Sequence, residues 1–211
     1  MFLLNRFYKH GGLTMDTANR TKTHLSNSLK RLSKEIPLCK ISVKDLCQYS
    51  NVNRGTFYYH FKDIFDLISW TYHTQITLPS RRIIAGYSIT EMPSITSFIL
   101  TQLYNEKEFY TQALTMEGQN NLAATVEADS IENWKLLWKK ALGVEKFEDI
   151  KYENIDFLLD YFVRGHLYAT HHWIETGMKT SPEKLGKILD DASMKGAISF
   201  WQEILLIQKS N

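Results

Sequence analysis

A short run of polar, basic and aromatic residues between Asn53 and Lys62 carries side chains suited to contacting DNA. Arg54, Thr56 and Tyr59 could bond to base edges, which is the contact that distinguishes one DNA sequence from another. The other candidate DNA-binding residues could contact phosphates or position the backbone, and they are Ser42, Lys44, Asn53, Tyr58, His60 and Lys62. Phosphate contacts fix the register of a protein on the duplex without specifying its sequence. These residue types predict a surface that binds double-stranded DNA.

Two short helices and a tight turn are the elements that must position these side chains. Ser42 predicts the start of the first helix, because its hydroxyl can accept from a free N–H and Asp45 completes a capping box. Asn51 suits the turn, since asparagine tolerates the left-handed backbone region. Asn53 can then cap the second helix. The apolar face of the first helix consists of Val43, Leu46 and Cys47.

The second helix is too polar to be buried and too short to be stable alone. Phe57 and Phe61, four residues apart, predict its attachment to a core, with the polar residues between them facing outward. A helix, a short turn and an exposed polar helix form the helix-turn-helix motif, whose second helix lies in the major groove. An earlier helix over residues 19–35, with Leu25, Leu29 and Leu32 on one face, completes a three-helix domain.

The run from Asn53 to Phe61, preceded by Ile41 to Leu46, resembles the DNA-binding domain of TetR-type transcription regulators. The resemblance implies a homodimer that binds a palindromic operator. Two positions depart from the family pattern: Asn51 replaces the usual glycine of the turn, and Ile64 replaces a lysine. Asparagine suits the same backbone region, and Lys62 could supply the phosphate contact that Ile64 cannot make.

Charge is distributed unevenly along the 211 residues, although the net charge is only +2. Residues 1–62 contain eleven Lys and Arg against three acids, a net charge of +8. Residues 63–211 contain fourteen basic and twenty acidic residues, a net charge of −6. A basic first third joined to an acidic remainder favours a nucleic-acid binder with a separate regulatory body.

No apolar run reaches the length of a membrane-spanning helix, and the N-terminus has no signal-peptide pattern. Cys39 and Cys47 lack disulfide spacing and are expected to be small apolar residues in a reducing environment. A cytoplasmic protein without membrane contact is therefore predicted. Residues 1–14 are either a tail, a DNA-contacting arm or an extension before a true start at Met15.

The remainder of the chain has the three-and-four spacing of long helices, with no strand-like alternation. One helix is predicted from Asp63 to a point before Pro79. Others are predicted from Pro93, over residues 109–116, 120–142 and 154–176, and from residue 182 toward the C-terminus. The predicted fold is all-α, with a helix-turn-helix DNA-binding domain over residues 15–62 and a regulatory and dimerisation domain over residues 63–211.

Aromatic residues of the second domain have three interpretations, since they could form core, line a ligand cavity or face a protein partner. Candidate ligand contacts are Tyr72, Tyr104, Tyr110, Trp134 and Phe162. A metal site among His166, His171, His172 and Glu175 is disfavoured, because their spacing suits one helix face poorly. No catalytic or phosphate-binding motif occurs, so neither enzyme activity nor a cofactor is predicted.

The last two predicted helices carry long apolar stripes, and Ala192 and Gly196 would permit close helix approach, which predicts a dimer built on a four-helix bundle. Gly165 to Leu167, Trp173 to Met178 and Ser181 to Leu185 resemble the dihydroxyacetone kinase operon regulators within the TetR type. That resemblance implies an activator with a protein co-regulator. The alternatives are a small-molecule-responsive repressor of an adjacent gene and a non-regulatory DNA-binding structural protein.

Overall fold

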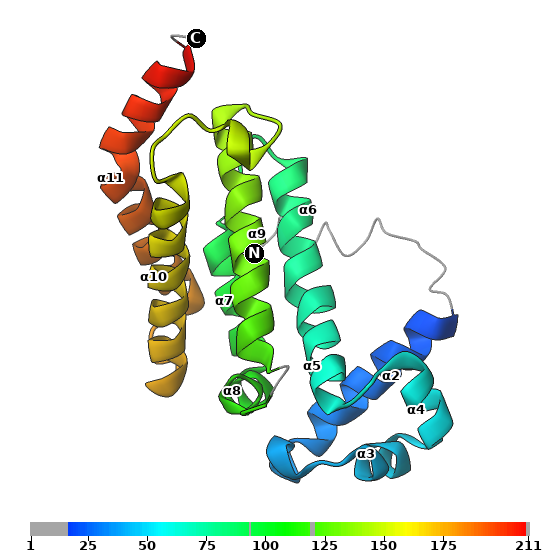
Figure 1. Cartoon of the computed structure of the whole chain (residues 1–211). Helices are drawn as coiled ribbons and strands as arrows, with labels where there is room; N and C mark the ends of the chain where they lie inside the picture. The colour runs from blue at the N-terminus through cyan, green and yellow to red at the C-terminus, as the bar shows by residue number, and fades with distance from the viewer. Residues whose placement is uncertain (1–16, 93, 119–120, 210–211) are drawn as a thin grey trace.

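The computed structural model describes residues 17–92, 94–118 and 121–209, and it is helical, without a strand, over that part of the chain (Figure 1). The helices are α2 (Thr17–Leu32), α3 (Val43–Ser50), α4 (Arg54–His60), α5 (Ile64–Tyr72), α6 (Leu78–Gly86), α7 (Ile95–Asn105), α8 (Lys107–Thr115), α9 (Leu122–Leu142), α10 (Ile155–Glu175) and α11 (Pro182–Lys209). Two 3₁₀ turns, Leu38–Lys40 and Phe147–Asp149, complete the connections. The all-α prediction is confirmed. The expectations for residues 1–14 and Pro93 lie outside the described residues.

The N-terminal unit, residues 17–62, packs α2 across α3 and α4. Leu25 and Leu29 of α2 are fully buried and Leu32 nearly so, as their spacing predicts. Leu46 of α3 and Phe57 of α4 are fully buried in the same cluster. The three helices therefore share one apolar cluster, and packing against this cluster fixes the direction of α4.

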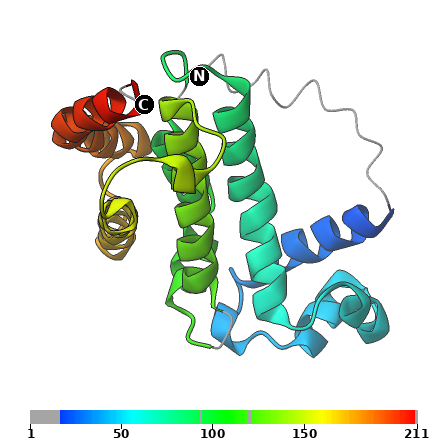
Figure 2. The same cartoon turned by 45° about the horizontal axis from the view of Figure 1, so that its top comes forward.

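A long rod leads from the N-terminal unit into the body, residues 63–209, and Figure 2 shows its lower end beside α2. The rod consists of α5, a π-helical turn at His73–Thr77 and α6. The prediction that this helix ends before Pro79 is wrong. The π turn shifts the hydrogen-bond register, with the Leu78 N–H bonding to the His73 carbonyl, and Pro79 falls in the first turn of α6, where a proline is tolerated.

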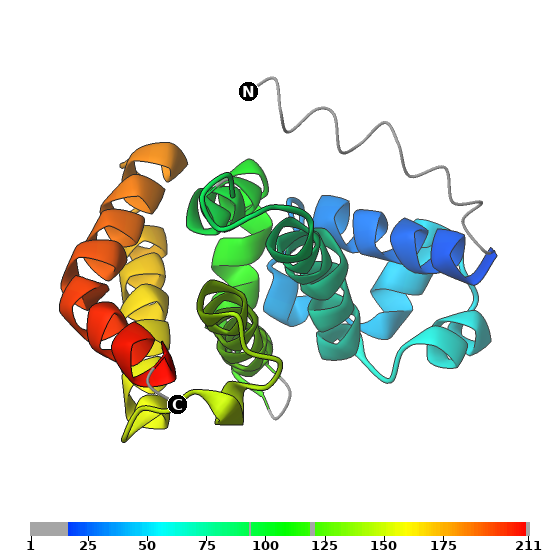
Figure 3. The same ribbon diagram turned by 90° about the horizontal axis from the view of Figure 1, so that it is seen from above.

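Beyond the rod, the body is built in layers. Figure 3, seen from above, shows α10 with α11 as an outer layer, α7 with α9 as a middle layer and the α5–α6 rod as the next. The tightest contact between layers lies where α11 crosses α7. A Cβ added to Gly186 of α11 would lie 2.8 Å from both the backbone nitrogen and the Cα of Ser97.

Two buried clusters stabilise this arrangement. The larger runs from Leu25 in the N-terminal unit through Leu67 to Leu100 and Trp173 in the body. The smaller surrounds Trp138 and Phe162, between α9 and α10. None of the described helices combines the length and the apolar character that crossing a bilayer requires. Ala192 and Gly196 of α11 were expected to permit close helix approach. Ala192 is exposed, and the surroundings of Gly196 lie outside what the structure describes.

Candidate nucleic-acid interface and body cavity

The turn between α3 and α4 is shaped by hydrogen bonds between near neighbours. The Asp45 N–H donates to the Ser42 hydroxyl oxygen over 3.2 Å, and the Ser42 N–H donates to the Asp45 carboxylate over 3.0 Å. The Ser42 hydroxyl also donates to that carboxylate, and these bonds lower the pKa of Asp45. Asn51 ends α3 in the left-handed conformation, with φ 54° and ψ 37°. The predicted capping box and the predicted role of Asn51 are confirmed.

Helix α4 begins at its own cap and is fixed by two rings. The Thr56 N–H donates to the Asn53 side-chain oxygen over 2.7 Å, which satisfies a free donor of the first turn. Phe57 is fully buried and Phe61 is nearly so, with their ring centroids 5.9 Å apart. Since both anchors point inward, the intervening residues of α4 face outward.

The outward face of α4 is crowded with hydrogen-bonding groups. Tyr59 is 82% exposed, and Tyr58 is about half exposed. The Arg54 guanidinium lies 5.8 Å from the centre of the Tyr58 ring and donates to its hydroxyl, which raises the pKa of Arg54. Thr56 and His60 are half-buried beside them. A cationic guanidinium held against a ring on an exposed helix suits contact with base edges or phosphates.

The remaining candidates for DNA contact lie around this helix. Ser42, Lys44, Asn53 and Lys62 are all exposed. All nine predicted residues belong to the segment that contains α3 and α4, which Figure 1 shows at one end of the molecule. Ile64 is buried at the start of α5, where it cannot reach a phosphate. Lys62 precedes it with its side chain exposed, and its N–H donates to Asp66 over 3.0 Å.

A polar joint that was not predicted connects the N-terminal unit to the body. The Gln112 side chain of α8 accepts from the Leu38 N–H over 2.8 Å and donates to the Ser33 carbonyl over 3.1 Å. Lys30 is largely buried and forms an ion pair with Glu106 over 2.9 Å. Leu38 and Gln112 are 74 residues apart, and Lys30 and Glu106 are 76 residues apart. No local pattern in the sequence therefore predicts these contacts.

The body contains a cavity of about 950 Å³ bordered by every helix from α5 to α11, with α8 contributing Leu114. Its walls are mainly apolar, from Ile99 of α7 and Leu137 of α9 to Ile174 of α10. The volume lies within the range of sites that hold drug-sized ligands. This cavity is the described feature of the body best suited to hold a small molecule.

Three of the five aromatic residues predicted for a ligand site, Tyr72, Trp134 and Phe162, line this cavity. Tyr104 instead lies outside it, 42% exposed, and stacks on Trp173 with ring centroids 6.3 Å apart. Tyr110 is fully buried and donates to Gln75 over 3.2 Å. Burial raises the pKa of both Tyr72 and Tyr110, so both hydroxyls stay neutral.

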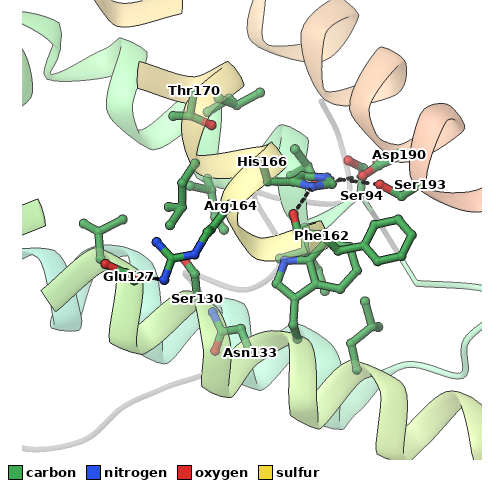
Figure 4. Close-up of a pocket in the computed structure, with 18 of the residues that line it drawn as sticks. Ser94, Glu127, Ser130, Asn133, Phe162, Arg164, His166, Thr170, Asp190 and Ser193 are labelled. Carbon is green, nitrogen blue, oxygen red and sulfur yellow. Dashed lines mark hydrogen bonds and ion pairs between the residues drawn. The ribbon is translucent and has the colours of Figure 1, made fainter. Parts of the chain in front are cut away.

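The cavity's polar groups were not predicted as ligand contacts, because they are scattered among distant helices. Figure 4 shows Arg164 near Glu127 on one side, and His166 near Asp190 and Ser193 on the other. Arg164 bonds to Asp160 over 2.7 and 2.8 Å and to Glu127 over 3.1 Å, and these contacts raise its pKa.

His166 is the buried titratable group of the cavity. Its Nδ1 donates to the Phe162 carbonyl over 2.9 Å, and its Nε2 lies 3.3 Å from the Ser193 hydroxyl. Burial lowers the pKa of His166, partly offset by the Phe162 carbonyl and by Asp190, so the neutral imidazole is favoured at pH 7. His171 pairs instead with Glu175 over 3.5 Å, and no group of three potential metal ligands is found among the described residues.

Comparison with known proteins agrees with this architecture. Residues 90–195 match the TetR_C_8 family model, described as a transcriptional regulator C-terminal region. The solved structure of the "Dihydroxyacetone kinase operon activator DhaS" is similar with a TM-score of 0.54 and 19% identity, covering 81% of this chain and 92% of that chain. No curated protein matches the chain. Since the family model spans half of the chain, this protein belongs to the TetR-type transcriptional regulators, and its fold is similar to that of the solved regulator.

Proposed function

We propose that this regulator binds a palindromic DNA operator as a homodimer and that α4 reads the bases. The observation that carries this proposal is the exposed polar face of α4, fixed from behind by Phe57 and Phe61. Arg54, Thr56 and Tyr59 are assigned to base edges. Ser42, Lys44, Asn53, Tyr58, His60 and Lys62 are assigned to the phosphate backbone or to positioning. Residues 15–62 would form the DNA-binding domain and residues 63–211 the regulatory and dimerisation domain.

The experiment is selection of bound sites from random duplexes, followed by gel-shift titration of the full chain. Arg54→Ala should lower the affinity for the selected site and relax preference at one base pair in each half-site, by about 1–3 kcal/mol. Lys62→Ala should weaken binding to all sequences alike and reduce the salt dependence by about one phosphate contact. Lys179→Ala, an exposed lysine far along the chain, is the control. Unchanged affinity and preference in Arg54→Ala would refute the assignment of α4.

Dimerisation is supported by an aromatic face on α10 that the described part of the chain leaves uncovered. Phe157, Tyr161 and Tyr168 are 78%, 67% and 74% exposed, and they recur at helical spacing on the outer layer. Ile188 and Leu206 of α11 are also more than half exposed. Large apolar side chains gathered on one face are typical of a surface that a partner covers. A second copy would cover it symmetrically and set the spacing of two α4 helices.

The dimer is tested by analytical ultracentrifugation. Tyr161→Glu should lower the sedimentation mass to that of a monomer, because two like charges would then be buried near the two-fold axis. Tyr49→Glu, which changes an exposed tyrosine of α3, should leave the mass unchanged. A dimer that persists in a Phe157→Glu, Tyr161→Glu double variant would refute this interface.

The regulatory input remains a choice between two proposals. The name of the structural neighbour, an operon activator, favours activation of a dihydroxyacetone kinase-like operon. The sequence resemblance adds a protein co-regulator to this first proposal. The cavity favours the alternative, a small-molecule-responsive repressor of an adjacent gene. A reporter gene placed behind the selected operator distinguishes activation from repression. Either role implies a non-enzymatic cytoplasmic protein, and the exposed α4 gives no support to a structural DNA-coating role that ignores sequence.

A further inference from the structure

We propose that the body cavity binds an apolar aromatic molecule carrying a protonated amine, and that the Asp190 carboxylate binds the amine. This inference rests on the proposed function, because it specifies the chemistry of the small-molecule input. It depends on four features of the cavity: an anionic carboxylate, a neutral imidazole, stacked aromatic rings and a cation that is already paired.

Asp190 supplies a carboxylate without a matching charge. It lines the cavity from α11, and the Thr96 hydroxyl of α7 donates to its Oδ1 over 2.7 Å. Among the described residues, no lysine, arginine or histidine nitrogen lies within ion-pair distance of Asp190. Lys187, on the same helix, pairs instead with Asp191 over 3.2 Å. A partly buried carboxylate in this situation favours a cationic ligand, since a counter-charge repays its lost hydration.

His166 adds a hydrogen-bond acceptor beside that carboxylate. Its Nδ1–H donates to the Phe162 carbonyl, so the neutral ring presents a lone pair at Nε2. The Ser193 hydroxyl near Nε2 donates its one hydrogen to the Leu189 carbonyl over 2.8 Å. Nε2 therefore lacks a strong donor among the described residues. An ammonium group has three hydrogens and can donate to Asp190 and His166 together.

Aromatic rings form the wall next to this polar corner. Trp134 and Phe162 stack with centroids 5.7 Å apart, and Trp134 meets the His166 ring at 4.9 Å. In Figure 4, Phe162 and His166 lie on the same side of the cavity as Asp190. Ring faces attract a cation and also cover an aromatic ligand body, so one wall serves both parts of the molecule.

An anionic ligand fits this cavity poorly. Arg164 is the one lysine or arginine among the described residues that line it, and two carboxylates, Asp160 and Glu127, already bond to its guanidinium. A carboxylate ligand would have to share the guanidinium with these two carboxylates and would be repelled by Asp190. A neutral ligand could enter but would leave Asp190 without a counter-charge.

The experiment compares three probes of one shape: 2-(naphthyl)ethylamine, 2-(naphthyl)ethanol and naphthylacetate. Binding to the full-length protein is measured by calorimetry at pH 7 and checked by thermal shift. The amine should bind about tenfold or more tighter than the alcohol, as a desolvated charge pair with a cation–π contact predicts. The acid should bind more weakly than the alcohol. An acid that binds more tightly than the amine, or no binding by any of the three, would overturn the proposal.

Two matched variants locate the amine. Asp190→Asn should reduce the preference for amine over alcohol to about twofold or less while leaving alcohol affinity unchanged. Asp191→Asn, which changes the adjacent acid of the same helix, should keep the native preference. An unchanged preference in Asp190→Asn would overturn the assignment, and circular dichroism verifies that each variant is folded. The probe comparison on the native chain needs no variant, so the proposal is testable even if Asp190→Asn does not fold.

Failure of this inference is distinguishable from failure of the proposed function. Gel shifts with the selected operator, without any probe, test DNA binding alone. If the protein bound the operator but bound naphthylacetate more tightly than the amine, only the proposed ligand class would be refuted. If the protein did not bind the operator but bound the amine tenfold more tightly than the alcohol, the proposed function would be refuted and the ligand class would be supported.

Discussion

The N-terminal unit and the body hold their functional side chains in opposite ways. In the N-terminal unit, the bonds of Ser42 with Asp45 and of Asn53 with Thr56 join residues three apart in sequence. In the body, the bond from Thr96 to Asp190 joins residues 94 apart and two separate helices. Local bonds survive a shift of neighbouring helices, whereas bonds between layers change with it. Under the proposed function, this difference would give a rigid DNA-contacting end and an adjustable body, which is the division that a ligand-controlled regulator requires.

The joint at Gln112 offers one path by which such a shift could reach the N-terminal unit. Gln112 lies on α8 and bonds to the backbone just after α2, while Leu114 of the same helix lines the cavity. A ligand that displaces α8 would therefore move the segment from Ser33 to Leu38. This segment leads directly into α3, so a small displacement would change the angle at which α4 meets DNA.

The largest expected effect is Gly186→Ala, in the contact between α11 and α7. A new Cβ would approach the Ser97 backbone too closely, so the helices must separate, at a cost of about 1–3 kcal/mol in the free energy of unfolding. Gly86→Ala is the control, because a Cβ there has open space at the end of α6. That change should be neutral or stabilising by up to about 1 kcal/mol. Urea denaturation measures both, and equal effects would show that the layers are not tightly packed.

The joint is tested by Gln112→Ala, which leaves the Leu38 N–H and the Ser33 carbonyl without this partner. Both residues are buried, so the free energy of unfolding should fall by about 1–2 kcal/mol. Gln112→Glu retains an acceptor for Leu38 but loses the donor to Ser33, and should cost less than the alanine variant if Leu38 carries the larger share. A joint that couples the two regions also predicts that probe binding alters operator affinity less in Gln112→Ala than in the native chain. Equal coupling in both would assign the connection to the α5–α6 rod alone.

A smaller and more local effect is expected from Asn53→Ala. Removing the cap of α4 should cost about 1 kcal/mol, because the Thr56 N–H loses its acceptor. Hydrogen exchange should accelerate at the amides of α4 and stay unchanged in α9, since the bond is local. Asn53→Ser, which restores a capping oxygen, should recover most of the protection. Accelerated exchange in α9 as well would contradict the local character of this bond.

The same contrast explains how much of the molecule could be predicted from its sequence. The capping box at Ser42, the turn at Asn51 and the anchors Phe57 and Phe61 were predictable because their causes lie within a few residues. Continuation of the rod past Pro79 was missed because a π turn, which has no simple sequence signal, preceded the proline.

Cavity residues were harder to predict for a related reason. Helical spacing identifies an inward face, but it does not show whether that face meets core or cavity. Trp134 lines the cavity, Tyr110 is buried in the core, and Tyr72 does both, although all three have the same periodic pattern. The sequence did not predict that Asp190 and His166 lie near each other, because only the packing of α10 and α11 brings them together.

The smallest expected effect is Asn51→Gly, at the turn that ends α3. Asn51 has φ 54°, a conformation that glycine adopts without steric cost and that alanine adopts only at about 1 kcal/mol or more. Glycine should therefore change the free energy of unfolding by less than about 0.5 kcal/mol, since its relief of strain offsets its greater freedom in the unfolded chain. Asn51→Ala, in contrast, should destabilise measurably in the same urea titration. If glycine and alanine were equally destabilising, the Asn51 side chain would have a role beyond tolerating the turn, and the N-terminal unit would depend on more than its local backbone geometry.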